Sequence, residues 1–219
     1  MRDGAASPRP PEQQRRERAR VVLAVAAVIV WAVGAGVTRR VGYWTGLGGT
    51  AVGLGTLCLL VGRPRDERLI GYRLALGAAI GCGVVMAIAA WTLYPALGRL
   101  IPSLVDDKIG LYAAFAALPR LEAAVLLPVI IAGEELVWRG VVQEALIRRT
   151  TRRAAVLWCA LIYGLATLPC GSLLLASTAF ACGLVWSGLR VATGGVLAPI
   201  ACHLLWAVLV LFVRPVRLG

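Results

Sequence analysis

The sequence is poor in the side chains that most often carry enzyme chemistry. It contains one histidine, His203, and one lysine, Lys108, among 219 residues. A catalytic zinc site usually takes three protein ligands, often two or more of them histidines, and the H-E-x-x-H sequence is absent. Glu134, His203 and either Cys170 or Cys202 form the only set of metal ligands that the sequence suggests. A divalent metal is therefore poorly supported, and no definite cofactor is indicated.

Paired cysteines and nucleophile motifs are also missing. Six cysteines lie in or beside apolar segments, and no two have C-x-x-C spacing, so neither a zinc knuckle nor a redox motif is supported. We interpret them as small apolar packing residues. The sequence has no G-x-S-x-G motif, and its single lysine leaves no Ser/Lys pair.

Long hydrophobic runs make up most of the chain. Apolar residues account for 59% of it, against about 45–50% in a soluble domain. They are grouped in stretches of about 17–24 residues, the length of a helix that spans a bilayer. The predicted spans are 21–37, 43–61, 74–97, 121–149, 154–168, 172–189 and 195–213. The sequence therefore predicts an all-α polytopic integral membrane protein with about seven transmembrane helices.

The polar segments complete this domain organisation. Residues 1–20 are rich in arginine and contain proline, which predicts a disordered basic cytoplasmic tail. Residues 21–213 are predicted to form a single helical membrane domain. The segment 98–120 contains Pro102 and three charged residues at 106–108. It predicts a loop with a short interfacial helix near its end, or an eighth, re-entrant span.

The distribution of basic residues predicts the topology. The net charge is +12, and nearly all the basic residues are arginines at the ends of apolar runs. With the N-terminus inside, 15 Arg and Lys residues fall on the cytoplasmic side, several of them in the connector 63–73, and 7 fall outside. We expect a multi-pass protein of the cell (inner) membrane with a cytoplasmic N-terminus. No basic helix is interleaved with exposed aromatics, so a nucleic-acid partner is not expected.

The stretch 133–140, Gly-Glu-Glu-Leu-Val-Trp-Arg-Gly, is charged in the middle of a predicted span. A charge near the bilayer centre costs roughly 2.5–3.5 kcal/mol on insertion scales, and such residues usually face a protein interior or a watery cavity. Glu135 and Arg139 have i, i+4 spacing in the favourable order and predict a buried ion pair. Glu134 has Trp138 as its i+4 neighbour and remains available for chemistry.

Two further polar side chains are expected at the same depth. A helix rises about 1.5 Å per residue. By this measure the distance from the end of the helix is roughly 21 Å for Glu134, roughly 20 Å for Thr167 and roughly 12 Å for His203. All three fall in the central zone of the bilayer. They are therefore predicted to share one cavity.

These residues resemble a known family. Glu134-Glu135-x-x-x-Arg139 is similar to the signature of the CPBP intramembrane proteases, which include the CAAX prenyl endopeptidases and the bacteriocin-processing proteins. The family continues with F-x-x-x-H and then H-x-x-x-N or H-x-x-x-D, which align here with Tyr163 to Thr167 and with His203 to Ala207. The resemblance covers about residues 119–213. Thr167 replaces the first histidine of the family, and Ala207 replaces its Asn or Asp.

The resemblance implies that Glu134 activates water as a general base. Glu135 and Arg139 would support it, and His203 would stabilise the oxyanion. A carboxylate in an apolar cavity has a raised pKa, which suits proton transfer near neutral pH, and a neutral imidazole can donate a hydrogen bond to an oxyanion. Thr167 could donate a hydrogen bond but cannot act as a base.

Three functions remain open at this point. The first is an intramembrane endopeptidase that cleaves a membrane-associated or C-terminal tail, whether a sorting signal or a lipid-modified segment. The second is a protein of the same fold that binds a membrane partner without cutting it. The third is a small proton-coupled transporter that uses Glu134; no inverted repeat is found in its favour. The sequence indicates nothing about the oligomeric state.

Overall fold

The computed structural model describes residues 11–61 and 69–216, and all regular elements in these ranges are helical. The first half contains α1 (Pro11–Val41), the π-helix η1 (Trp44–Gly48), α2 (Gly49–Val61), α3 (Tyr72–Leu100) and α4 (Ser103–Ala116). The second half begins with α5 (Arg120–Glu135), the π-helix η2 (Leu136–Val142) and α6 (Gln143–Ile147). It continues with α7 (Arg152–Thr167), the 3-10 turn η3 (Leu168–Cys170), α8 (Leu173–Thr193), α9 (Leu197–Val208) and the π-helix η4 (Leu209–Val213).

The all-α membrane fold is confirmed, but the number of spans is not. Five helical segments of the described chain are long and apolar enough to cross a membrane. A sixth arises if α4 and the helix Arg120–Ile147, bent by 104° relative to each other, count as one broken span. The segment Leu197–Val213 is apolar but shorter. Length and composition therefore support five or six spans, and the predicted seven or eight remain unconfirmed.

Two predicted polar segments differ from the structure. The helix α1 begins at Pro11, so residues 11–20 of the predicted disordered tail are helical, and residues 1–10 lie outside the described residues. In the segment 98–120, α4 covers Ser103–Ala116, a longer helix than expected. Most of the charged connector, residues 62–68, also lies outside the described residues.

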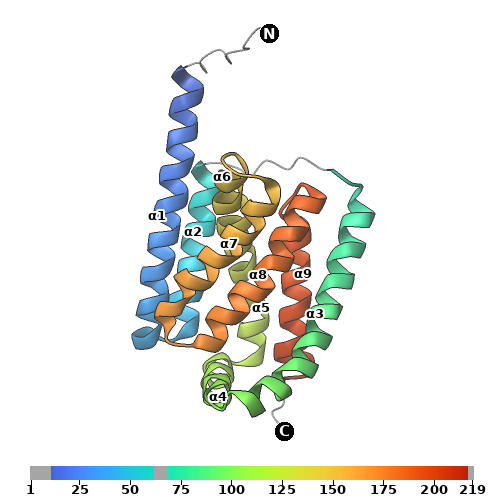
Figure 1. Ribbon diagram of the computed structural model, residues 1–219. Coiled ribbons are helices and arrows are strands. Elements are labelled where there is room, and N and C mark those ends of the chain that lie inside the picture. The colour runs from blue at the N-terminus through green and yellow to red at the C-terminus, as the bar shows by residue number, and fades with distance from the viewer. Residues whose placement is uncertain (1–10, 62–68, 217–219) are drawn as a thin grey trace.

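Figure 1 shows how these helices surround α5. The blue α1 and cyan α2 lie on one side of the bundle, the green α3 lies on the other, and α4 lies at the lower end. The helix α7 packs along α8, α3 packs against α9, and α2 packs against α5. This arrangement places the charged stretch of α5 and η2 inside the bundle, with neighbours from α1, α2, α7, α8 and α9.

Close backbone contact brings α2 and α5 together beside the charged stretch. Gly55 and Gly133 face each other so closely that a Cβ on either residue would collide with the backbone of the opposite helix. Only glycine fits this crossing, as at many interfaces between membrane helices. The spacing Gly49-x-x-x-Gly53 on α2 would also suit a close approach of two helices, but a Cβ on either of these two glycines would meet open space.

The predicted topology can be tested with tags. We expect a tag inserted at residue 65 or residue 150 to be accessible from the cytoplasm only, because the basic residues are concentrated on that side. The measurement is protease or antibody accessibility in intact cells and in inside-out vesicles. Access from the outside at either position would contradict the topology.

Candidate functional site

The charged stretch lies where α5 changes from an α-helix to a π-helix. Glu134 and Glu135 are the last residues of α5, and the wider turns of η2 begin at Leu136. Such π-turns are frequent at functional sites. Both carboxylates are buried: Glu134 is 6% exposed and Glu135 is fully covered. A charge in this position needs partners inside the protein.

Glu135 has the partner that its spacing predicts. Arg139 donates a hydrogen bond to Glu135 Oε1 at 3.1 Å, and both side chains are completely buried, so the predicted ion pair is confirmed. Arg139 also donates to the carbonyl of Gly183 on α8 at 3.3 Å. Its guanidinium lies 5.2 Å from the ring centres of Tyr163 and Trp186. The charge is thus held by a carboxylate, a carbonyl and two aromatic rings.

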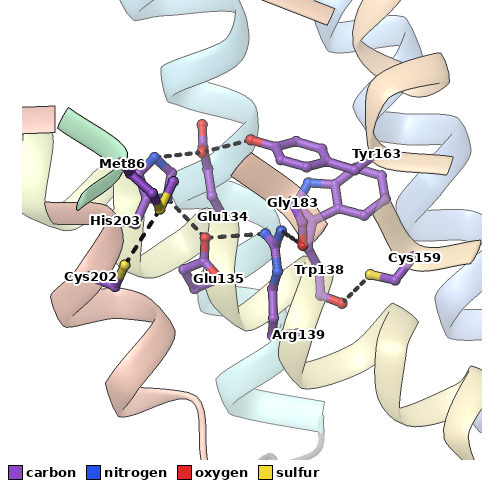
Figure 2. Close-up of polar contacts among 10 residues, drawn as sticks. All are labelled: Met86, Glu134, Glu135, Trp138, Arg139, Cys159, Tyr163, Gly183, Cys202 and His203. Carbon is purple, nitrogen blue, oxygen red and sulfur yellow. Dashed lines mark hydrogen bonds and ion pairs between the residues drawn. The ribbon is translucent and has the colours of Figure 1, made fainter. Parts of the chain in front are cut away.

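His203 on α9 is fixed by the same carboxylate. Its Nδ1 lies 2.8 Å from Glu135 Oε1, and its ring stacks on Trp186 at 3.7 Å with an interplanar angle of 18°. An ionised carboxylate can only accept, so Nδ1 carries the proton that faces Glu135. The other ring nitrogen, Nε2, lies 4.0 Å from Glu134 Oε2. Figure 2 shows the imidazole beside both glutamates, with a dashed line to each.

Glu134 is held by a tyrosine. The hydroxyl of Tyr163 on α7 donates to Glu134 Oε2 at 3.1 Å (Figure 2). No described residue forms a hydrogen bond with the second oxygen, Oε1, so it remains available to a bound water. Glu134 therefore has one anchored oxygen and one available oxygen.

The residues that depart from the family pattern also lie at this site. Thr167 is buried, and its hydroxyl donates to the Tyr163 carbonyl at 2.9 Å and accepts from Trp31 Nε1 at 3.3 Å. Ala207, one turn after His203, is buried in an apolar cluster with Leu127 and Ile131. The place of the family's first histidine is thus taken by a Thr–Trp pair, and the place of its amide is apolar.

One cavity connects these side chains. Its volume is about 110 Å³, enough for several water molecules. Glu134, Thr167 and His203 all line it, which confirms the prediction that they share a cavity. Their catalytic roles stay predictions. The walls are mostly apolar and come from α1, α3, α4, α5, α7, α8 and α9.

Comparison with known proteins agrees with this geometry. Residues 116–209 match the model of the type II CAAX prenyl endopeptidase Rce1-like family. The match supports the resemblance of this part of the chain, called the CPBP segment below, to the CPBP family. No match to the chain was found among curated proteins or among solved structures. The CPBP segment contains both glutamates, Arg139, Thr167 and His203, whereas Trp31 lies outside it.

Three aromatic residues of the site were not predicted as site residues. Tyr163 binds Glu134, Trp186 stacks on His203, and Trp31 reaches the CPBP segment from α1. Only Tyr163 had a signal in the sequence, because it stands where the CPBP motif has phenylalanine and its hydroxyl needs a partner once buried. The contacts of Trp186 and Trp31 had no such signal, because they depend on how α1, α8 and α9 cross.

The metal set suggested by the sequence does not assemble. Among residues 11–61 and 69–216, no three His, Cys, Asp or Glu side chains lie close enough to share a metal ion. Cys202 is directed toward the sulfur of Met86 at 3.8 Å (Figure 2), and Cys170 lies beside Ser172. Neither the Cys202 thiol nor the Cys170 thiol therefore forms a metal-ligand group with Glu134 and His203.

Loss of the Tyr163 hydroxyl should weaken the CPBP site without unfolding it. We expect Tyr163→Phe to reduce kcat about tenfold with little change in KM, because one charge-assisted hydrogen bond is worth about 1.5–3 kcal/mol and here positions Glu134. The measurement is steady-state cleavage of a peptide substrate. Tyr72→Phe, at an exposed tyrosine, is the matched control. An unchanged kcat in Tyr163→Phe would show that the hydroxyl does not position the base.

Proposed function

We propose that the protein is an intramembrane endopeptidase that cleaves a membrane-associated peptide with water activated by Glu134. The observation that carries this proposal is the shared apolar cavity, which both Glu134 and His203 line, with His203 Nε2 4.0 Å from Glu134 Oε2. The family match supports a function of the CAAX-protease type. The substrate class and the residue roles are our proposal.

In the first step, Glu134 acts as general base. A water molecule hydrogen-bonded to Oε1 gives its proton to this carboxylate as its oxygen attacks the carbonyl carbon of the scissile peptide bond. The hydrogen bond from Tyr163 holds Oε2, so that Oε1 keeps its direction toward the cavity. The carbonyl oxygen becomes an oxyanion in the tetrahedral intermediate.

In the second step, His203 stabilises the oxyanion. Because Nδ1–H faces Glu135, a neutral imidazole would leave Nε2 without a proton, and Nε2 can donate only when the ring is doubly protonated. Glu135, which accepts from Nδ1, is suited to stabilise that imidazolium, because Glu134 is neutral once it has taken the proton of water. This refines the expectation from the sequence, which had assigned the donor role to a neutral imidazole.

The reaction ends with return of the proton. The protonated Glu134 donates to the nitrogen of the leaving amine as the C–N bond breaks, which regenerates the carboxylate and releases an acid and an amine. Apolar walls exclude bulk water and strengthen the electrostatic interactions inside the site. A chain segment that reaches this cavity has to be apolar, which favours a membrane-associated tail as substrate.

A second candidate function rests on Thr167 and Ala207. Because neither provides the histidine or the amide of the family motifs, the protein could bind the same apolar tail without cutting it. The two functions differ in the response to restoring the motif. For an endopeptidase, the double substitution Thr167→His and Ala207→Asn should raise the cleavage rate above that of the wild type, because it adds two donors to the cavity.

The experiment is co-expression with tail-anchored substrates, with processing followed by mass spectrometry of the released fragment. Cleavage by the wild type supports the endopeptidase. No cleavage by the wild type but cleavage by the restored variant would favour the binding function. Absence of cleavage in both, with normal membrane levels, would contradict the proposed chemistry.

A further inference from the structure

The cavity of the proposed endopeptidase contains an ammonium group that the mechanism does not use. Lys108 on α4 is the only lysine in the chain, and it lines the same cavity as Glu134 and His203. No other lysine or arginine of the described residues lines it. The family match begins at residue 116, so Lys108 lies outside it.

Lys108 is oriented by an aromatic ring. Its Nζ lies 5.8 Å from the ring centre of Tyr112, one turn further along α4. That ring is itself fixed, because the Tyr112 hydroxyl donates to the Val210 carbonyl at 2.8 Å and accepts from Val216 N at 3.0 Å. The ammonium group is thus held on a rigid support at the cavity wall.

No carboxylate of the described residues neutralises this cation. Within residues 11–61 and 69–216, no ion pair involves Lys108, although two aspartates precede it directly. Asp107 is occupied at the start of α8, where it accepts from Leu174 N at 3.0 Å and from the Ser172 hydroxyl at 3.4 Å. Asp106 is exposed. A half-buried ammonium without a counter-charge favours an anion from a ligand.

The cavity therefore has two polar regions of different chemistry, with apolar lining residues between them. The cation lies at the α4 wall, and the carboxylate and imidazole lie on α5 and α9. An apolar peptide that ends in a free carboxylate matches this pattern, with its charged end on Lys108 and an internal peptide bond at Glu134. A lipid phosphate could match the cation alone, but it would leave no amide at Glu134.

We propose that Lys108 binds the C-terminal carboxylate of the peptide that occupies the cavity. This proposal rests on the proposed function, since it assigns a specificity residue to the same site. It implies that the distance from Lys108 to Glu134 sets the cleavage position, counted from the end of the substrate. Peptides that continue past the α4 wall, or that end in an amide, would be poor ligands.

Binding can be tested apart from cleavage. The purified full-length Glu134→Gln protein in maltoside detergent is titrated with an apolar, N-terminally fluorescent hexapeptide that has a free C-terminal carboxylate. The same peptide with a C-terminal amide is measured in parallel by fluorescence anisotropy. The same Glu134→Gln background carries Lys108→Gln, Lys108→Arg or the matched control Arg120→Gln, which removes an exposed cation from the next helix without touching the cavity.

We expect the parent protein to bind the acid about 10–100-fold more tightly than the amide, the contribution of one charge-assisted contact. Lys108→Gln should lose this preference, whereas Lys108→Arg and Arg120→Gln should retain it. Equal affinity of the parent for acid and amide would overturn the proposal. So would a preference that disappears when phosphatidylglycerol surrounds the protein, since Lys108 would then bind a lipid phosphate.

The two proposals fail separately. If the acid preference depends on Lys108 but the wild type cuts no peptide, the carboxylate site stands and the endopeptidase proposal falls. If the wild type cuts acid and amide peptides equally well and Lys108→Gln does the same, cleavage stands and the role of Lys108 is wrong.

Discussion

Replacement of Glu134 by glutamine is expected to reduce cleavage about 10²–10⁴-fold, the usual contribution of a general base. Glutamine has nearly the same shape and keeps an oxygen that can accept the Tyr163 hydrogen bond. It cannot take a proton from water. The loss should therefore appear in kcat, with peptide binding and membrane levels close to those of the wild type.

Two further variants make this result specific. His203→Ala should also lose most activity, because it removes the imidazole that faces Glu134 across 4.0 Å. Glu122→Gln is the matched control, an exposed glutamate in the first turn of the same helix, α5. The measurement is processing of a co-expressed tail-anchored substrate at matched membrane levels. Wild-type processing by Glu134→Gln and His203→Ala would refute the assigned roles.

The second large effect should be on stability. Glu135→Gln removes the charge that neutralises the fully buried Arg139. Breaking a buried ion pair on one side usually costs about 3–5 kcal/mol, because the remaining charge is left uncompensated. We expect lower membrane levels and a clearly lower thermal midpoint in detergent. The cost arises from Arg139, so it should be present even without substrate.

A double-mutant cycle separates this effect from chemistry. Glu135→Leu combined with Arg139→Leu removes both charges and should be more stable than either single variant. Activity should remain low in the double variant, since His203 loses the acceptor for Nδ1. Additive losses of stability in the cycle would contradict the assignment of Glu135 and Arg139 as an energetically coupled pair.

Most helices could be predicted from the sequence because apolar runs end at recognisable signals. Pro169 stands directly after the predicted span 154–168, where a proline ends a helix, and α7 ends at Thr167. The side chain of Ser172 caps the start of α8. The helical residues 11–20 and the full length of α4 were missed, because charged composition alone favours a loop or a disordered tail in both places.

The site could be predicted where it depends on spacing within one helix. Glu135 and Arg139 pair as their i, i+4 positions require, and Glu134, Thr167 and His203 line one cavity. The hydrogen bond of Tyr163 with Glu134 joins α5 to α7, and the direction of each side chain depends on the π-turn that follows Glu135. No pattern within one segment of the sequence predicts such a contact between two helices.

The contact between Trp31 and Thr167 has a consequence for the timing of activity. The two residues are 136 positions apart, and His203 comes later still, on α9. Chains emerge from the ribosome at about 5–20 residues per second, so roughly 7–27 s separate the synthesis of Trp31 from that of Thr167, and roughly 3–14 s separate that of Glu134 from that of His203. During this interval Glu134 enters the membrane without its imidazole. The proposed endopeptidase would consequently be inert as a nascent chain until its last helix is made.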